Sequence, residues 1–380
     1  MNLLVVGHVV HKKKENRFFA YGPYVREMNL WGEYVDQITI LAPFNPLEHP
    51  DPIDLPFFHS QVSLVQVPQF NLTSGGEIIK TFFKLPFLVI KIWKAMRKAD
   101  HIHLRCPGNM GLIGSVVQIA FPSKMKSAKY AGNWDRKESK PFSYRIQQKI
   151  LSNSFLTKNM QVLVYGDWPN ESKNIKPFFT ASYSETEIQP FKERVLENQS
   201  QLRLVFAGGL TVGKQPLISA KVAESMILRG IDVRLDFYGE GEERGRLESF
   251  IEEGQLQNSI FLHGNVNAET LKQAFQETHF LIFISQSEGW PKVVAEAMFW
   301  GCVPITTEVS CVPQMLGYGE RGELVKGQIE EIINILESYI LKPELFKEKS
   351  QKAMEWSRQF TLERFKKELQ SILQVKIKID

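Results

Sequence analysis

The chain has 380 residues, of which 43% are hydrophobic and 23% charged, and its formal net charge is +4. This length favours two domains, and the composition excludes a disordered or collagen-like chain. So weak a positive charge gives no support for a nucleic-acid-binding surface, and we expect no nucleic-acid partner.

Cysteine usage and hydropathy bear on the cellular compartment. Cys106, Cys302 and Cys311 are too widely spread for a disulfide framework or a metal-binding pair, as is typical of a reducing cytoplasm. The apolar run at 3–7 predicts a buried strand and lacks the features of a signal peptide. Because no stretch of about 18 uninterrupted apolar residues occurs, we expect a cytoplasmic protein whose only membrane contact would be peripheral.

The first half of the chain alternates apolar strands with helical patterns. Strands are predicted at 3–7, 36–43, 101–105, 128–132 and 162–166, with helices at 78–98 and 109–120. Strands of continuous Val, Ile, Leu and Phe are typical of sheets covered by helices on both faces. We therefore predict an N-terminal doubly wound domain over residues 1–185.

The same alternation restarts after a polar, proline-containing stretch at 177–200. Strands are predicted at 203–209, 233–241, 259–264, 280–285 and 302–307, with helices at 215–229, 243–254 and 268–276 and another opening at Pro291. These elements predict a second doubly wound domain over 186–355. We expect the C-terminal helix at 356–380 to pack back on the first domain; the alternative is that it only caps the second.

The most informative run, SQSEGWPKVVAEAMFWGCVP, begins where a predicted strand ends at Ser285. Ligands of open α/β sheets bind at this carboxyl edge, where the loop carries Glu288 and Gly289. Gly289 lets a ligand approach the backbone, and Pro291 suits a first helical turn. The backbone amides at the helix start are placed to hold hydroxyls or phosphate oxygens, and they belong to Trp290, Lys292 and Val293.

A second glutamate, Glu296, follows Glu288 by eight residues. It lies between Ala295 and Ala297 in an otherwise apolar helix, where an unpaired carboxylate would be costly. The alternative interpretation makes Glu288 a partner of the helix dipole and Glu296 a solvated surface residue. The apolar context favours a site in which the two acceptors bind a sugar and a ribose.

This run resembles glycosyltransferase family 4, whose mark is the pattern E-G-x-P-x-x-x-x-E-A-x-x-x-G-x-P. The sequence over 288–304 reads E-G-W-P-K-V-V-A-E-A-M-F-W-G-C-V-P and matches every defined position. The resemblance implies the GT-B fold, two doubly wound Rossmann-like parallel-sheet domains facing each other. It also implies retaining transfer from a nucleotide diphosphate sugar, with Glu288 on the donor sugar and Glu296 on the ribose hydroxyls.

The resemblance extends to the loop after the first strand of the second domain. The family has G-R-L followed by a lysine, and this chain has Gly208, Gly209, Leu210 and then Lys214. Lys214 is thus the candidate cation that stabilises the departing diphosphate. The family arginine is replaced by Gly209, so either another cation such as Lys292 or Arg105 substitutes, or activity is weak or lost.

Two further turns resemble the family's nucleobase pocket. FLHGNVNAETL corresponds to the strand and turn that hold the base through backbone groups of Gly264, Asn265 and Val266. Gly239 and Gly241 in YGEG correspond to a second glycine turn lining the same pocket.

The acceptor half offers fewer signals. Gly22 is the expected counterpart of the family's glycine-rich loop, and Asn133 stands where many members have a histidine. Arg105 lies at the carboxyl end of a strand and is an acceptor-side candidate, whereas His103 on the same face is expected to have a core role. The lysine run at 12–14 is interpreted as a solvated loop tip.

The segment 78–98 carries six lysines and arginines among aromatic and aliphatic residues. Such a helix can lie on an anionic membrane surface, or it can be a core-packing helix with snorkelling lysines. The first interpretation implies a lipid-linked acceptor and a location at the inner face of the membrane.

The prediction is a retaining glycosyltransferase that moves a sugar from a nucleotide diphosphate sugar to a glycan or lipid-linked glycan acceptor, in cell-surface polysaccharide synthesis. We expect no bound metal or other cofactor, because no Asp-x-Asp motif or histidine cluster occurs. Two alternatives stay open. One is a nucleotide-sugar epimerase of the same fold, and the other is a degenerate homologue that acts as a binding partner in polysaccharide assembly.

Overall fold

The computed structural model describes residues 1–46, 49–51, 53–68, 75–190, 194, 196 and 201–374, with side chains of the helix at 75–98 described from residue 85. The chain divides into two compact units. Unit 1 comprises Met1–Phe178 together with the segment from Lys366, and unit 2 comprises Phe179–Phe365. The sequence had suggested boundaries after residues 185 and 355.

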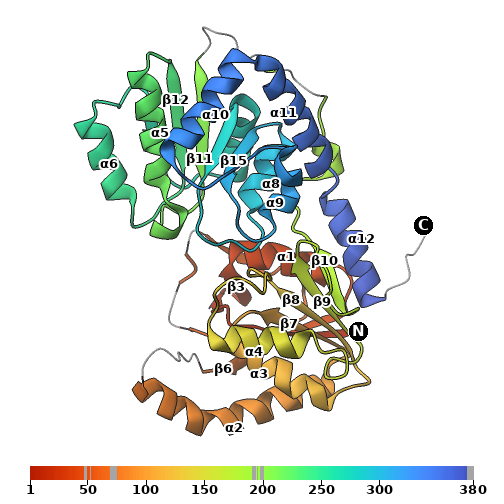
Figure 1. Ribbon diagram of the computed structural model, residues 1–380. Helices are drawn as coiled ribbons and strands as arrows, with labels where there is room; N and C mark the ends of the chain where they lie inside the picture. Colours follow the sequence, from red (N-terminus) through yellow and green to blue (C-terminus); the bar gives the residue numbers. More distant parts are fainter. Residues whose placement is uncertain are drawn as a thin grey trace. The chain divides into compact units, whose positions relative to one another are not determined.

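Unit 1 is built on a seven-stranded sheet in which every pairing is parallel, in the order β10-β9-β8-β7-β1-β4-β6 (Figure 1). Its strands are β1 (Asn2–Val6), β4 (Gln37–Pro43), β6 (Val62–Val67), β7 (His101–Cys106), β8 (Met125–Tyr130), β9 (Met160–Tyr165) and β10 (Ile175–Phe178). Its helices are α1 (Gly22–Gly32), α2 (Gly75–Lys98), α3 (Asn109–Val117), η1 (Gln118–Ala120) and α4 (Phe142–Leu151).

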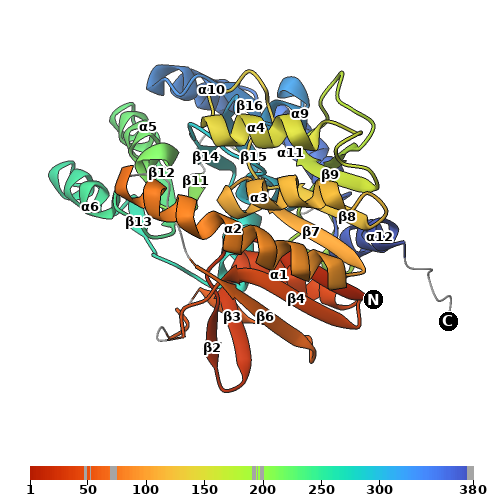
Figure 2. The same ribbon diagram turned by 90° about the horizontal axis from the view of Figure 1, so that it is seen from below.

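Helices cover both faces of this sheet, and its strands are largely buried. Figures 1 and 2 show α2, α3 and α4 on one face and α1 on the other. On the first face, Ile92 and Met96 of α2 pack against Leu104 of β7 in one buried cluster. On the second face, α1 buries Met28 and Trp31.

The segment after β1 differs from the expected loop. β2 (Lys12–Lys14), β3 (Arg17–Tyr21) and β5 (Asp54–Pro56) form a small antiparallel sheet. Lys12 is only 6% exposed, and its Nζ lies 2.5 Å from Asp51 Oδ2 and 3.0 Å from Asp54 Oδ2. The prediction of a solvated tip was therefore wrong for Lys12, since two carboxylates compensate its buried charge; Lys13 and Lys14 are exposed.

Unit 2 contains a six-stranded parallel sheet in the order β13-β12-β11-β14-β15-β16. Its strands are β11 (Leu202–Ala207), β12 (Val233–Tyr238), β13 (Ile260–Leu262), β14 (Phe280–Phe283), β15 (Val303–Thr307) and β16 (Glu323–Val325). Its helices include η3 (Val212–Lys214), α5 (Pro216–Leu228), α6 (Arg244–Glu253), α7 (Ala268–Glu277), α8 (Lys292–Phe299), α10 (Ile329–Leu341) and α11 (Pro343–Ser357).

The helices of unit 2 form two groups. α5 packs with α6 and α10, whereas α8 packs with α7 and α11. Two parallel-sheet α/β units confirm the predicted doubly wound fold class. The short strand β16 had not been predicted, because three residues carry too little pattern.

The C-terminal helix α12 (Leu362–Leu373) crosses the division between the units. In its second part, Lys366 Nζ lies 2.8 Å from Glu33 Oε2, next to the end of α1. Residues 375–380 of the predicted C-terminal segment lie outside the described residues. Over the part of the chain that is described, no helix has the length and apolarity needed to cross a membrane.

Candidate functional site

Three glycines continue the strand pairing of unit 2 beyond the carboxyl ends of β11, β12 and β13. Gly208 N donates to Tyr238 O at 2.9 Å, and Gly239 N donates to Gly264 O at 2.8 Å. The φ angles of Gly208, Gly239 and Gly264 are +140°, +141° and +70°, a region that favours glycine. A Cβ on Gly239 would lie 1.9 Å from Gly208 O, so the loops approach this closely only without a side chain.

The neighbouring glycines differ in what their backbone requires. A Cβ on Gly241 would lie 2.2 Å from Leu210 O, so this position also excludes a side chain. Gly209 has no positive φ, and a Cβ there would meet nothing closer than Thr211 Cγ2 at 3.6 Å. The absence of the expected arginine at Gly209 is therefore not imposed by the local backbone.

Lys214 and Glu288 meet at the same edge of the sheet. Lys214 ends η3, Glu288 lies in the loop after β14, and Lys214 Nζ is 3.3 Å from Glu288 Oε1. Gln286 N donates to Gly213 O at 2.9 Å and joins the two loops. Ser285 Oγ donates to Glu288 Oε1 at 2.8 Å, which orients the carboxylate. Residues distant in sequence thus form one charged pair at the predicted site.

The start of α8 (Lys292) follows Glu288 closely in sequence. Gly289 O accepts from Ser310 Oγ at 3.1 Å, which fixes the loop before the helix. The Trp290 ring stacks on Trp356 with a centroid separation of 6.2 Å. Pro291 is the N-cap residue, so the amides of Lys292 and Val293 stand in the first helical turn at the carboxyl edge.

Glu296 is half-buried in the middle of α8, next to buried Ala295 and Ala297. Its Oε1 accepts a hydrogen bond of 2.5 Å from Ser182 Oγ. Glu296 is therefore a half-buried carboxylate with a hydroxyl partner. This environment differs from that of the fully solvated surface residue in the alternative interpretation.

The turn after β13 exposes Asn265 and half-buries Val266. Next to it lies an arrangement that sequence reasoning missed: the His263 ring stacks on Tyr238 at 4.6 Å and 12°, and His263 Nε2 lies 2.6 Å from Asp236 Oδ1. The available signal was Asp236 itself, an acid inside the apolar strand β12. These rings bring flat, polar-tipped side chains close to the predicted base-binding turn.

The acceptor-side candidates Gly22 and Asn133 have well-defined surroundings in unit 1. Gly22 N donates to Ile53 O at 3.0 Å, and a Cβ there would lie 2.5 Å from that oxygen. Close backbone packing thus accounts for glycine at this position. Asn133 is buried, and its Oδ1 accepts from Asp135 N at 2.8 Å. Its Nδ2 has no hydrogen-bond partner among the described residues.

Arg105 belongs to a buried charged cluster that the sequence did not predict. Its Nη1 donates to Glu27 Oε1 at 2.6 Å, and Lys129 Nζ donates to Glu27 Oε2 at 2.7 Å. Burial alone would raise the pKa of the Glu27 carboxyl, but Arg105 and Lys129 hold it well below its usual range. The signals that could have been used are charged residues within the predicted elements, Glu27 in α1 and Lys129 in the buried strand β8.

Two histidines under α1 share one hydroxyl. His101 Nε2 and His103 Nδ1 both lie 2.8 Å from Ser127 Oγ, and the ring of His103 is 4.4 Å from that of Trp31. Burial lowers the pKa of His101 to about 4 and that of His103 well below its usual value. Both rings are therefore neutral core groups near pH 7, in line with the expected role of His103.

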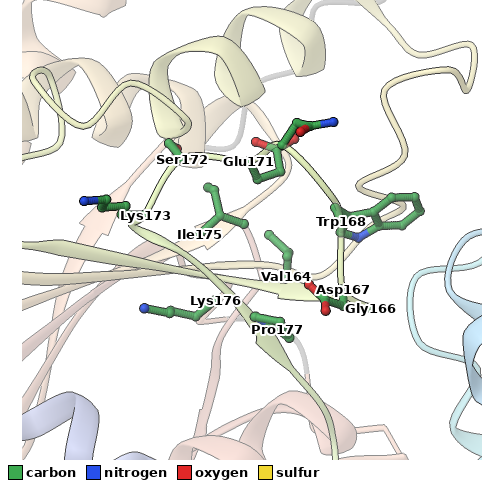
Figure 3. Close-up of a pocket in the computed structure, with 11 residues that line it drawn as sticks. Val164, Gly166, Asp167, Trp168, Glu171, Ser172, Lys173, Ile175, Lys176 and Pro177 are labelled. Carbon is green, nitrogen blue, oxygen red and sulfur yellow. The ribbon is translucent and has the colours of Figure 1, made fainter.

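A cavity of about 400 Å³ lies along the connection from β9 to β10 in unit 1 (Figure 3). Its lining includes Trp168, Lys173 and Glu171. Arg136 Nε donates to the Glu171 carboxylate at 2.7 Å. None of the residues singled out from the sequence line this cavity, so it is a separate feature of the unit.

Metal-binding side chains do not cluster: among the described residues, no group of three or more His, Cys, Asp or Glu is placed to hold an ion. Cys106, Cys302 and Cys311 are buried thiols without a disulfide. Burial raises the pKa of each thiol to about 12.

Residues 187–356 match the family model described as Glycosyl transferases group 1. An uncharacterized glycosyltransferase from Haemophilus influenzae is 29% identical over 157 residues, which cover 40% of this chain and 43% of the relative. Poly(glycerol-phosphate) alpha-glucosyltransferase from Bacillus subtilis is 30% identical over 112 residues, which cover 29% of this chain and 15% of that protein. The chain thus spans less than half the length of these curated relatives.

Among solved structures, HepE from Anabaena in complex with UDP superposes with a TM-score of 0.69 over 99% of this chain and 100% of HepE, at 13% identity. A likeness at this identity bears on the fold alone. It confirms two Rossmann-like parallel-sheet domains of the GT-B type. The range that matches the Glycosyl transferases group 1 model lies within unit 2 and includes Lys214, Glu288 and Glu296.

Proposed function

We propose that this chain is a retaining glycosyltransferase that moves a sugar from a nucleotide diphosphate sugar to a glycan or lipid-linked glycan acceptor. The observation that carries the proposal is the pairing of Lys214 with Glu288 at 3.3 Å, inside the range matched by the group 1 family. The pair lies at the carboxyl edge of the sheet, where ligands of such folds bind. Its surroundings are glycine loops and the start of a helix.

In the proposed reaction, negative charge grows on the diphosphate as its bond to the sugar breaks. Lys214 stabilises that charge, and the amides at the start of α8 add donors aimed at the phosphate oxygens. The pairing with Glu288 keeps Lys214 in position before the donor arrives. Glu288 then turns to the sugar, and Glu296 accepts hydrogen bonds from the ribose hydroxyls.

Retention of the anomeric configuration rests on the resemblance to glycosyltransferase family 4. In that chemistry the departing phosphate takes the proton of the acceptor hydroxyl, so a protein base is not needed. Asn133 fits this scheme, because an amide can bind a hydroxyl but does not act as a base near neutral pH. The proposal predicts a product whose new linkage has the anomeric configuration of the donor, measured by NMR of the product.

The acceptor class is proposed from the relatives. The protein from Bacillus subtilis is named for glucosyl transfer to poly(glycerol-phosphate), a polymer that carries a phosphate in every repeat. We propose an acceptor from cell-surface polysaccharide synthesis, with the reaction taking place in the cytoplasm at the inner face of the membrane. No bound cofactor is part of this proposal.

We propose a peripheral membrane contact through α2, extending the expectation for 78–98 to its described side chains. Phe87, Ile90 and Trp93 are 56%, 50% and 39% exposed. They recur at a spacing of three, and Lys94 and Arg97 are exposed beside them on the same helix. Exposed aromatic side chains next to basic ones complement an anionic lipid surface. The aromatic rings can enter the acyl-chain boundary, and the basic side chains can pair with the anionic headgroups.

Vesicle flotation tests this contact. Wild-type protein is expected to float with vesicles of phosphatidylcholine and phosphatidylglycerol, and not with phosphatidylcholine alone. Trp93→Ser and Lys94→Glu should each weaken binding, whereas Lys176→Glu, an exposed position on β10, is the matched control. Equal flotation of wild type with both vesicle types would reject the electrostatic contact.

The transferase activity is tested first by binding. Calorimetry with UDP, GDP and ADP sugars identifies the donor, and Glu296→Gln is then expected to lower its affinity about 10- to 100-fold, the loss of one charged hydrogen-bonding group. Glu252→Gln, an exposed glutamate of α6, is the control and should bind like wild type. Unchanged affinity in Glu296→Gln would refute the site assignment.

Turnover separates the remaining alternatives. Lys214→Gln should reduce turnover about 10²- to 10³-fold, the usual loss when one donor to a developing negative charge is removed. Conversion of the donor sugar without any acceptor would identify an epimerase instead. Failure to bind any nucleotide sugar would favour the degenerate homologue, an alternative suggested by Gly209 and Asn133.

A further inference from the structure

The carboxylate of Glu296 is oriented by a serine that lies far away in sequence. Ser182 Oγ donates to Glu296 Oε1 at 2.5 Å, and the two residues are 114 positions apart. Among the described residues, no other hydrogen bond or ion pair engages this carboxylate. Its orientation therefore depends on Ser182, since a glutamate side chain that is not held samples many rotamers.

The segment that carries Ser182 is attached to the same helix as Glu296. The next residue, Tyr183, is buried, and the centroid of its ring lies 4.8 Å from that of Phe299 and 5.2 Å from that of Trp300, at the end of α8. Phe299 comes three positions after Glu296, so the two side chains are neighbours on the helix surface. Ser182 and Tyr183 thus contact adjoining positions of α8.

Hydrogen bonds to two other helices fix this region. Leu362 N, at the start of α12, donates to Tyr183 O at 2.9 Å. Ser357 Oγ, at the end of α11, donates to Ala295 O of α8 at 2.6 Å. Because the backbone next to Ser182 is bonded on one side and α8 on the other, the Ser182 hydroxyl is a donor in a fixed position.

The hydrogen bond from Ser182 leaves this carboxylate able to bind a ligand. A carboxylate has about four acceptor positions on its two oxygens, and Ser182 uses one of them. Glu296 is half-buried and Ser182 is exposed, so the pair is accessible from solvent. A carboxylate held in one orientation can accept hydrogen bonds from two neighbouring hydroxyls together, and the 2′ and 3′ hydroxyls of a ribose are such a pair.

We propose that Ser182 positions the carboxylate of Glu296 and thereby determines the preference for ribonucleotides over 2′-deoxyribonucleotides. This inference rests on the proposed transferase function, because it assigns a specificity-determining residue to the donor site of the same reaction. Ser182 is a positioning residue in this scheme, since it acts through Glu296 and takes no part in bond breaking.

The test compares pairs of nucleotides by calorimetry on the full chain. The probe is whichever of UDP, GDP and ADP binds wild type most tightly, together with the 2′-deoxy form of the same nucleotide. Wild type is expected to prefer the ribonucleotide by about tenfold or more, the usual effect of one hydrogen bond to a charged group. Ser182→Ala should weaken ribonucleotide binding about fivefold and deoxyribonucleotide binding less than about twofold, so the preference should fall by more than about half.

Two further variants separate positioning from a structural role. Ser182→Thr keeps the hydroxyl and should restore the preference of wild type. Ser184→Ala removes a hydroxyl of the same segment, one that donates to Glu363 Oε1 at 2.6 Å, and should leave the preference unchanged. The melting temperatures of Ser182→Ala and Ser184→Ala, measured in parallel, show that both variants are folded.

The affinities of Ser182→Ala decide the inference. An equal loss for both nucleotides, or no loss for either, would overturn it, because the hydroxyl would then not act through the carboxylate. Tighter ribonucleotide binding would also overturn it, since the serine would then compete with the ribose. These results would leave the proposed function standing, because wild type would still bind a nucleoside diphosphate. Failure of wild type to bind any of UDP, GDP and ADP would instead refute the proposed function, and this inference with it.

Discussion

Gly208, Gly239 and Gly264, at the ends of β11, β12 and β13, form what we call the glycine floor of unit 2. Replacing Gly239 with alanine tests this floor and requires no knowledge of the substrate. The new Cβ would lie 1.9 Å from Gly208 O, and ordinary Cβ contacts begin near 3.4 Å, so the two loops must separate by about 1.5 Å. A movement of that size breaks the hydrogen bonds from Gly208 N to Tyr238 O and from Gly239 N to Gly264 O. Alanine must also hold a φ of +141°.

The magnitude follows from these three losses. Two backbone hydrogen bonds contribute about 1 kcal/mol each, and an unfavourable φ costs about 1–3 kcal/mol. We expect Gly239→Ala to destabilise unit 2 by about 3–5 kcal/mol, equivalent to a fall in melting temperature of about 6–20 °C for a domain of this size. Nucleotide binding should be lost even below the melting temperature, since the floor of the site is displaced.

The assay is thermal unfolding followed by circular dichroism, combined with calorimetry of UDP binding. Gly213→Ala is the matched control: it lies in η3, has no positive φ, and a Cβ there meets nothing within 4 Å. It should change stability by less than about 0.5 kcal/mol. If Gly239→Ala melted at the temperature of Gly213→Ala, the close approach of these loops would be wrong.

The remaining predictions concern acid stability and the missing cation. Because burial lowers the pKa of His101 and His103, these two rings bind up to two more protons in the unfolded chain than in the native one between about pH 6.5 and 4, and their share of the fall in the free energy of unfolding should reach about 2.7 kcal/mol per pH unit. Urea titrations followed by tryptophan fluorescence measure the total slope, which His103→Gln should reduce by up to about 1.4 kcal/mol per pH unit; a pH-independent midpoint above pH 4.5 would contradict it. Gly209→Arg should tighten UDP binding about tenfold, the effect of one added cation worth about 1.4 kcal/mol beside a diphosphate, and calorimetry at low and high salt should show the gain shrinking with salt. No gain at low salt would mean that the position does not face the phosphates.

The parts that could be predicted from the sequence are those encoded over short distances along the chain. The spacing of Glu288 and Glu296 follows from one loop and one helix, and the order of apolar strands determines a doubly wound sheet. The structure places Lys214 beside Glu288, as expected if both belong to one site. Whether these residues bind a donor stays a prediction.

The parts that could not be predicted depend on pairings between distant segments. Glu27 and Arg105 are 78 residues apart. The local sequence around each residue gives no sign that the other residue compensates its charge. Lys12 looked solvated because its run is basic, whereas its partner Asp51 lies 39 residues away. The side chains of 78–84, part of the helix expected to be basic and aromatic, lie outside the described residues.

The glycine floor at the ends of β11, β12 and β13 consists of main chain, so its shape is independent of the side chains around it. Homologues can therefore exchange the residues at its rim without rebuilding the main chain beneath them. If unit 2 binds the nucleotide as proposed, the choice among nucleobases depends on replaceable groups near this floor, such as His263 and Asn265. Swapping those two residues between relatives offers a direct way to redesign which activated sugar is accepted.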